Sequence, residues 1–177
     1  LVRAGKVRAI GASNFTAAQV REALDVAAAQ GLPRYAVLQP EYNLFDRAGF
    51  DGPLRDLALA EGLAVICYYS LASGFLTGKY RSAADLAQSP RGASIGQKYL
   101  NPRGLRILAA LDAVAARHAA QPGEVALAWL MARPGVTAPI ASASNVAQVE
   151  GLVRATQLQL SADDVEALDA ASAPEAA

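Results

Sequence analysis

The chain has 177 residues, of which 53% are hydrophobic and 18% charged, a profile of one globular domain with a substantial core. Lys plus Arg and Asp plus Glu both number 16, and Cys67 is the one cysteine. This composition excludes a strongly basic nucleic-acid binder and an internal disulfide framework. Because the charges balance, we expect no nucleic-acid partner. No apolar run reaches the roughly 18 residues of a membrane span, so we also expect no membrane partner. The single cysteine and the lack of a visible signal peptide favour a cytoplasmic protein.

The predicted elements alternate between strands and helices. The chain begins at Leu1 and enters the first strand almost at once, so we expect a fragment of a longer protein. The predicted strands lie at residues 7–11, 36–39, 63–68 and 136–140, and the predicted helices at 16–30, 52–61, 102–117, 124–132, 145–155 and from 161 onward. The first three strands recur at intervals of about 28 residues, which predicts parallel βαβ units with right-handed crossovers.

A long insertion follows the third predicted strand. Residues 70–101 are polar and contain Gly, Ser and Pro, whereas a βα loop usually has about 2–6 residues. A loop of this length inside a compact domain is usually functional, so we expect a lid over a ligand. At the other end of the chain, residues 174–177 are expected to fray.

Polar side chains follow the predicted strands. Ser13 and Asn14 come after the first strand, Gln39 ends the second, Tyr68 ends the third, and residues 142–148 follow the fourth. Ligands collect at the carboxyl ends of parallel strands, and Ser, Asn and Gln side chains can bind the carboxamide of a nicotinamide. Taken singly, each of these residues is more often an ordinary turn, cap or core residue. Their joint placement favours a nucleotide site.

The segment 65–80 carries the most informative local pattern. An apolar run ends on Tyr68 and Tyr69 and opens into small residues, glycines and Lys79. Such a segment can bring backbone N–H groups and a positive charge close to a phosphate. The alternative is an ordinary strand and loop with core tyrosines. Four βα units fit either half of an eight-stranded barrel or a small open sheet, and periodicity leaves both open.

Four segments together carry a family resemblance. Residues 5–15, 38–43, 68–80 and 125–130 resemble the second half of an aldo-keto reductase, in family order and at family spacing. The resemblance covers essentially all of residues 1–177 and implies an α/β fold of the (β/α)8 TIM-barrel type. On this basis we expect the C-terminal half of the barrel, strands five to eight with their helices, and a cofactor-closing loop at about 70–101.

The resemblance also implies an NADP site, with NAD as the alternative cofactor. Ser13, Asn14 and Gln39 would hold the carboxamide, and Tyr68 would stack on the nicotinamide ring. The other implied contacts are the backbone around Tyr69, Leu71, Ser73 and Gly74 for the pyrophosphate, Lys79 and Arg91 from the long loop, and Ser142, Ser144 and Gln148 for the adenosine end.

The sequence departs from the family pattern at the adenosine end. Many members carry a Lys or Arg in the segment that corresponds to residues 142–148, where this chain has none. Members often have Glu-Asn where Gly151 and Leu152 stand. We therefore expect a weaker preference for NADP than usual and the loss of an adenine contact.

The catalytic Asp, Tyr, Lys and His of the family lie in the first half of its barrel. The resemblance therefore assigns no catalytic residue and no metal ligand to this chain. His118 is expected to be a solvated surface histidine, and Cys67 a packed small residue.

These observations lead to an expected function and to two alternatives. We expect the complete protein to be an NADP(H)-dependent oxidoreductase that reduces small-molecule aldehydes or ketones, and this fragment alone to be inactive. The alternatives are a noncatalytic nicotinamide-nucleotide-binding sensor or subunit and an inactive truncated product. A half barrel exposes two strand edges, so we expect the isolated chain either to form a homodimer of half barrels or to be poorly stable.

Overall fold

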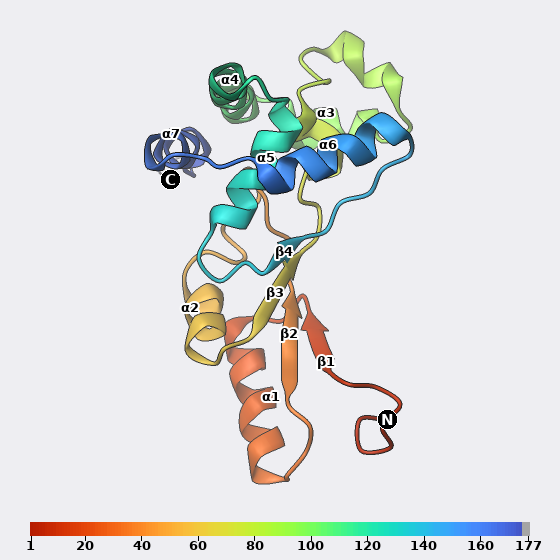
Figure 1. Ribbon diagram of the computed structural model, residues 1–177, viewed down its shortest axis with the longest axis vertical. Helices are drawn as coiled ribbons and strands as arrows, with labels where there is room; N and C mark the ends of the chain where they lie inside the picture. Colours follow the sequence, from red (N-terminus) through yellow and green to blue (C-terminus); the bar gives the residue numbers. More distant parts are fainter. Residues whose placement is uncertain (175–177) are drawn as a thin grey trace.

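The computed structural model describes residues 1–174, and its strands form a parallel sheet in the order β1-β2-β3-β4 (Figure 1). The strands are β1 (Ile10–Ser13), β2 (Tyr35–Gln39), β3 (Ala64–Cys67) and β4 (Ala138–Pro139). The predicted parallel pairing is confirmed. β1 begins later than expected, because its pairing with β2 starts at Ile10, opposite Tyr35, the first residue of β2.

The predicted helices are all present, and the structure adds short helices inside the long insertion. The α-helices are α1 (Ala17–Ala29), α2 (Pro53–Ala60), α3 (Gly92–Tyr99), α4 (Pro102–His118), α5 (Pro122–Ala132), α6 (Val146–Gln157) and α7 (Ala162–Ser172), and the 3-10 helices are η1 (Ala72–Thr77) and η2 (Ala83–Gln88). Thr16, Asn145 and Ser161 cap their helices as the sequence predicts.

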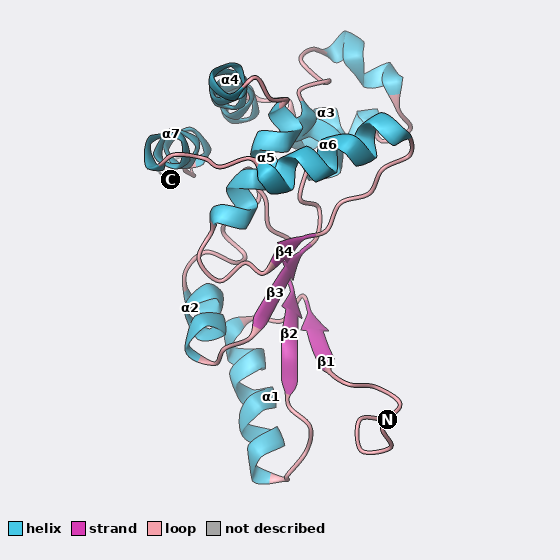
Figure 2. Ribbon diagram, in the orientation of Figure 1, coloured by secondary structure: helices cyan, strands magenta, loops and turns pink. Residues whose placement is uncertain are grey.

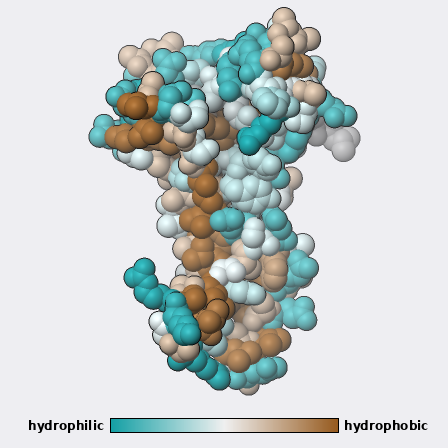
Figure 3. Space-filling model, turned by 90° about the vertical axis from the view of Figure 1, so that its right-hand side faces the viewer, coloured by the Kyte–Doolittle hydropathy of each residue, from teal (hydrophilic) through white to brown (hydrophobic). Residues whose placement is uncertain are grey.

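Helices cover one face of the sheet and leave the other partly open. Figure 2 shows α1 and α2 beside the strands and α4 to α7 gathered beyond the end to which the strand arrows point. Leu38, Val65 and Cys67 on one face are buried, whereas Val37 and Ile66, which alternate with them, are partly exposed. Figure 3 shows an apolar column along the middle of the molecule, at the level of the strands.

The insertion at 70–101 differs from the continuous loop that its composition suggests. Phe75 and Ile95 are buried in the core, and the Phe75 ring stacks on Tyr99 with centroids 5.5 Å apart. α4 comes so close to this segment that a Cβ on Gly104 would overlap Tyr99 O. Its apolar residues recur between polar ones, and burying them folds the insertion onto α4 and α5.

The C-terminal helix α7 is fixed to the rest of the molecule by Asp169. Its carboxylate accepts hydrogen bonds from Trp129 Nε1 at 3.0 Å, Arg133 Nη1 at 2.6 Å and Arg47 Nη1 at 3.1 Å. Arg47 and Arg133 also lie over the buried Trp129 ring.

The expectation of a solvated His118 is wrong. Its Nε2 lies 2.7 Å from Asp164 Oδ2, and Arg117 Nη2 lies 2.6 Å from Asp164 Oδ1. The helix end carrying His118 packs beside the start of α7, which buries the Asp164 carboxylate between these groups. Cys67 is fully buried, as expected, and burial raises the pKa of its thiol to about 12.

Within the described part, no helix combines the length and apolar character that crossing a membrane requires. The tail expected to fray is residues 174–177, and all of it except Pro174 lies outside the described residues.

Candidate functional site

The polar residues predicted at the strand ends come together at the carboxyl edge of the sheet. Ser13 Oγ donates to Gln39 O at 2.8 Å, and Tyr68 Oη donates to Asn14 Oδ1 at 2.7 Å. The parallel register explains the first contact, because it pairs Ser13 with Gln39 directly. Partial burial, followed by the nearby Glu41 carboxylate, raises the pKa of Tyr68. The phenol is therefore a hydrogen-bond donor at neutral pH.

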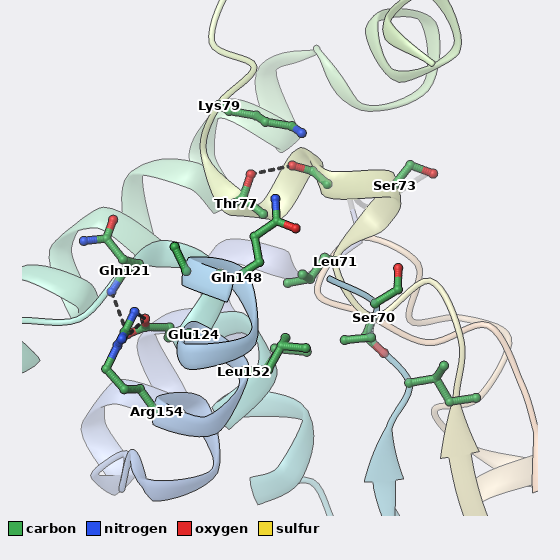
Figure 4. Close-up of a pocket in the computed structure, with 18 of the residues that line it drawn as sticks. Ser70, Leu71, Ser73, Thr77, Lys79, Gln121, Glu124, Gln148, Leu152 and Arg154 are labelled. Carbon is green, nitrogen blue, oxygen red and sulfur yellow. Dashed lines mark hydrogen bonds and ion pairs between the residues drawn. The ribbon is translucent and has the colours of Figure 1, made fainter. Parts of the chain in front are cut away.

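A pocket of about 750 Å³ lies next to this edge, between residues 69–79 and residues 140–154 (Figure 4). It is connected to the strand ends through Tyr69, whose ring lies 5.3 Å from the Tyr68 ring. The predicted site residues that line it are Tyr69, Leu71, Ser73, Gly74, Lys79, Ser142 and Gln148. Segments about 70 residues apart in the sequence thus form one cavity.

The wall at 69–79 depends on unusual backbone angles. Tyr69, Ala72 and Ser73 have φ of 52°, 48° and 58°, and Gly74 has φ of 93°. Thr77 Oγ1 donates to Gly74 O at 2.7 Å and closes the turn. A Cβ on Gly74 would lie 3.5 Å from Lys79 Nζ, so the ammonium group lies directly over this turn.

The opposite wall is the start of α6. The Asn145 side chain caps this helix by accepting from Gln148 N at 3.0 Å. Ser144 does not line the pocket but is held beside it, since Ser144 N and Oγ donate to Gln148 Oε1 at 2.7 and 3.1 Å. The N-terminal end of a helix carries a partial positive charge, which favours an anion on this side.

Besides Ser144, five predicted site residues lie outside the pocket lining. Ser13, Asn14, Gln39 and Tyr68 form the adjacent strand-end group described above. Arg91 is exposed at the start of α3, where its N donates to Ser89 Oγ at 3.0 Å. The structure therefore does not bring Arg91 to the pocket.

Sequence reasoning missed the part of the lining that comes from α5 and the later turns of α6. Gln121, Gly123, Glu124 and Leu127 line the pocket, as do Leu152 and Arg154. The available signal was Glu124, a charged residue at the head of an apolar run in a predicted helix. Its partner, Arg154, is 30 positions away and could not be identified from spacing.

The described residues contain no group of three or more His, Cys, Asp and Glu side chains that could hold a metal ion.

The parallel sheet, its helical connections and the pocket beyond the strand ends define an α/β protein. The sequence profile described as the Aldo/keto reductase family matches residues 1–173, and the chain belongs to this family.

Three similar proteins illustrate the extent of the match. Protein tas of Escherichia coli strain K12 is 33% identical over an alignment of 173 residues, and the match covers 95% of this chain and 49% of that protein. Aldo-keto reductase yakc (NADP(+)) of Schizosaccharomyces pombe is 32% identical over an alignment of 165 residues, and the match covers 90% of this chain and 46% of that protein. This chain is also similar to the crystal structure of the thermostable aldo-keto reductase Tm1743 with the inhibitor epalrestat, with a TM-score of 0.69 and 25% sequence identity. The match covers 96% of this chain and 50% of the Tm1743 chain. The chain spans about half the length of the relatives it matches.

Proposed function

We propose that this chain holds NADP(H), with NAD as the alternative, and serves an oxidoreductase that reduces aldehydes or ketones to alcohols. The observation that carries the proposal is the pocket between residues 69–79 and the start of α6, beside the strand-end group. Membership of the aldo/keto reductase family supports it, as does the NADP(+) in the printed name of the relative yakc.

The residues of the pocket fit a dinucleotide. Its volume of about 750 Å³ lies within the usual range of about 300–1,000 Å³ for small-molecule sites. Lys79, the Ser73 and Ser142 hydroxyls and the start of α6 suit a pyrophosphate, whereas Leu71 and Leu152 offer apolar surface to a ring.

The strand-end group would hold the nicotinamide. Asn14 and Gln39 carry side-chain amides that can donate to and accept from its carboxamide, and Tyr68 offers a ring face. The hydrogen bond from Tyr68 to Asn14 fixes both side chains before a ligand arrives. When bound, the cofactor supplies the hydride for the carbonyl carbon.

We further infer that the four strands correspond to strands five to eight of a (β/α)8 barrel, and that the proton-donating residues lie outside this chain. The chain's span of about half the relatives' length and the partly open sheet face support this inference. On this proposal the small-molecule carbonyl is a substrate of the complete protein, and the 177-residue chain reduces none.

Calorimetric titration with NADPH and NADH, together with the absorbance of NADPH over a panel of aldehydes, tests the proposal. We expect saturable binding without turnover for this chain, and turnover for a longer protein that contains it. Absence of binding overturns the cofactor assignment. Turnover by this chain alone overturns the inference that the proton-donating residues lie outside it. Binding without turnover in the longer protein favours a noncatalytic nucleotide-binding module.

A further inference from the structure

Tyr69 has a strained backbone at the junction between the strand-end group and the pocket. Its φ of 52° is rare for a residue with a large side chain. Tyr69 lines the cavity and is 51% exposed, and its ring lies 5.3 Å from the Tyr68 ring. Such a conformation persists only where the surroundings fix it. The groups that bind the Tyr69 backbone therefore also decide where its ring lies.

The Tyr69 carbonyl is held from inside the fold by Asn43. Asn43 Nδ2 donates to Tyr69 O at 3.1 Å, and Ala72 N donates to the same oxygen at 2.7 Å. The contact with Ala72 belongs to the turn itself, whereas Asn43 is fully buried and comes from the segment after β2, 26 positions earlier. The Asn43 amide thus attaches the strained turn to the segment that follows β2.

The hydrogen-bonding groups of the Asn43 side chain are also engaged on its other sides. Oδ1 accepts from Phe45 N at 2.8 Å and Asp46 N at 2.9 Å, and Nδ2 also donates to Asp46 Oδ2 at 3.2 Å. The Asp46 carboxylate in turn accepts from Tyr99 Oη at 3.0 Å and lies 3.0 Å from Lys98 Nζ, both on α3. The amide therefore keeps one orientation, in which it donates to the strained turn.

The main chain of Tyr68 is fixed separately. Tyr68 N donates to Pro40 O at 3.1 Å, and Tyr42 N donates to Tyr68 O at 3.4 Å, which extends the pairing of β2 with β3 beyond the strand ends. Loss of the Asn43 amide would therefore leave Tyr68 in the sheet and release Tyr69. The Tyr69 ring would then no longer be fixed beside the Tyr68 ring.

We propose that Asn43 is a positioning residue for the nicotinamide end of the cofactor: it holds Tyr69 in its strained conformation, and the Tyr69 ring supports the Tyr68 ring on which the nicotinamide would stack. This inference rests on the proposed function. Asn43 is buried outside the pocket lining, so it acts on a ligand only through the two tyrosines. A ring that is fixed before the ligand arrives loses less freedom on binding. The effect of Asn43 therefore falls on the nicotinamide rather than on the rest of the cofactor.

Calorimetry with NADPH and with 2′-phospho-ADP-ribose, which lacks the nicotinamide, tests the inference. In Asn43→Asp and Asn43→Ser the side-chain oxygen still accepts from the main chain of its own turn. The aspartate has no donor for Tyr69 O, and the serine is too short to reach it. We expect both variants to bind NADPH about tenfold more weakly and to bind 2′-phospho-ADP-ribose within about twofold of the unaltered protein. The fluorescence of bound NADPH, which reports the surroundings of the nicotinamide, should shift toward that of free NADPH.

Ser161→Ala is the control for a general loss of stability, because it removes the cap of α7 and should lower the melting temperature without changing either affinity. Thermal melting shows which Asn43 variants are folded, and one folded variant suffices for the comparison. An equal loss of affinity for both ligands overturns the inference, since Asn43 would then shape the whole pocket wall, and so does unchanged NADPH binding.

The unaltered protein separates this inference from the proposed function. If it binds NADPH no more tightly than 2′-phospho-ADP-ribose, the nicotinamide makes no fixed contact and the role of Asn43 is overturned while cofactor binding stands. If it binds neither ligand, the proposed function fails as well.

Discussion

Gly74 has the backbone conformation on which the pocket wall at residues 69–79 depends. Its φ of 93° is rare for residues with a side chain, and the Lys79 ammonium lies over it. The neighbouring Ala72 and Ser73 also have positive φ, so the turn has little freedom to relax.

Gly74→Ala should therefore destabilise the protein by about 1–2 kcal/mol and weaken NADPH binding. The added methyl group would meet Lys79 Cε and Nζ at 3.4 and 3.5 Å in a strained backbone. Urea unfolding and calorimetry measure the two effects. Gly49→Ala is the matched control, because a Cβ there meets nothing within 4 Å. Equal behaviour of the two variants would contradict the role given to Gly74.

Asp164 links stability to pH. Its hydrogen bond with His118, followed by those with Arg117 and Ser161, lowers the pKa of the carboxyl group below its ordinary value. Because the folded-state pKa is depressed, the stabilisation is complete above the unfolded-state pKa of about 3.9 and is lost as pH falls below it toward the folded-state value.

Asp164→Asn should lower the free energy of unfolding at pH 7 by about 1–3 kcal/mol and flatten the loss of stability below about pH 4. Urea midpoints between neutral pH and pH 3 provide the measurement. Asp163→Asn, at an exposed position in the same helical turn, is the control and should lose stability below about pH 4 as the unaltered protein does. The same loss of stability in Asp164→Asn would show that other groups govern acid unfolding.

At the scale of elements, α4 and the insertion at 70–101 meet through Gly104. A Cβ there would overlap Tyr99 O and come within 3.0 Å of the Phe75 ring. The insertion thus packs on the helix at a distance that only glycine permits, which fixes the segment that carries the pocket wall at residues 69–79.

Gly104→Ala should destabilise the protein by about 1–3 kcal/mol through overpacking, although alanine is the better helix former by about 1 kcal/mol. In Gly123→Ala, on α5, the new Cβ meets its nearest neighbour at 3.4 Å, an ordinary contact distance. The higher helix propensity of alanine should therefore stabilise this variant. Thermal unfolding of both variants tests the difference in sign. Stabilisation by Gly104→Ala would mean that α4 and the insertion pack less closely.

At the scale of the whole molecule, the sheet has an unpaired edge at β1 and another at β4 among the described strands. Val37 and Ile66 on its partly open face are apolar. Exposed edges and apolar sheet faces promote association.

We expect this chain in isolation either to form a homodimer of half barrels or to show low stability. Sedimentation and thermal melting distinguish these outcomes, and a cooperatively melting monomer contradicts both. If the dimer forms through the open face, Val37→Asp should shift it to monomer or abolish cooperative melting, whereas Val26→Asp, at an exposed position on α1, should leave its size unchanged.

Much of the fold followed from local patterns. The capping boxes at Thr16 and Ser161 and the βαβ spacing predicted helices and parallel strands, because such signals depend on residues a few positions apart. The insertion was misjudged as a loop, since isolated apolar residues such as Phe75 and Ile95 have no local sign of burial. His118 was misjudged because its partner, Asp164, is 46 positions away.

The sequence by itself determined the βα order, the polar residues at the strand ends, the tyrosine and glycine segment before Lys79, and the family resemblance. Only the tertiary structure decided that residues 69–79 and α6 enclose one cavity, that Arg91 stays outside its lining, and that Glu124 holds Arg154 at its rim. The physical reason is range. Capping and strand periodicity act between near neighbours, whereas a pocket and an ion pair require a folded core to bring distant segments together.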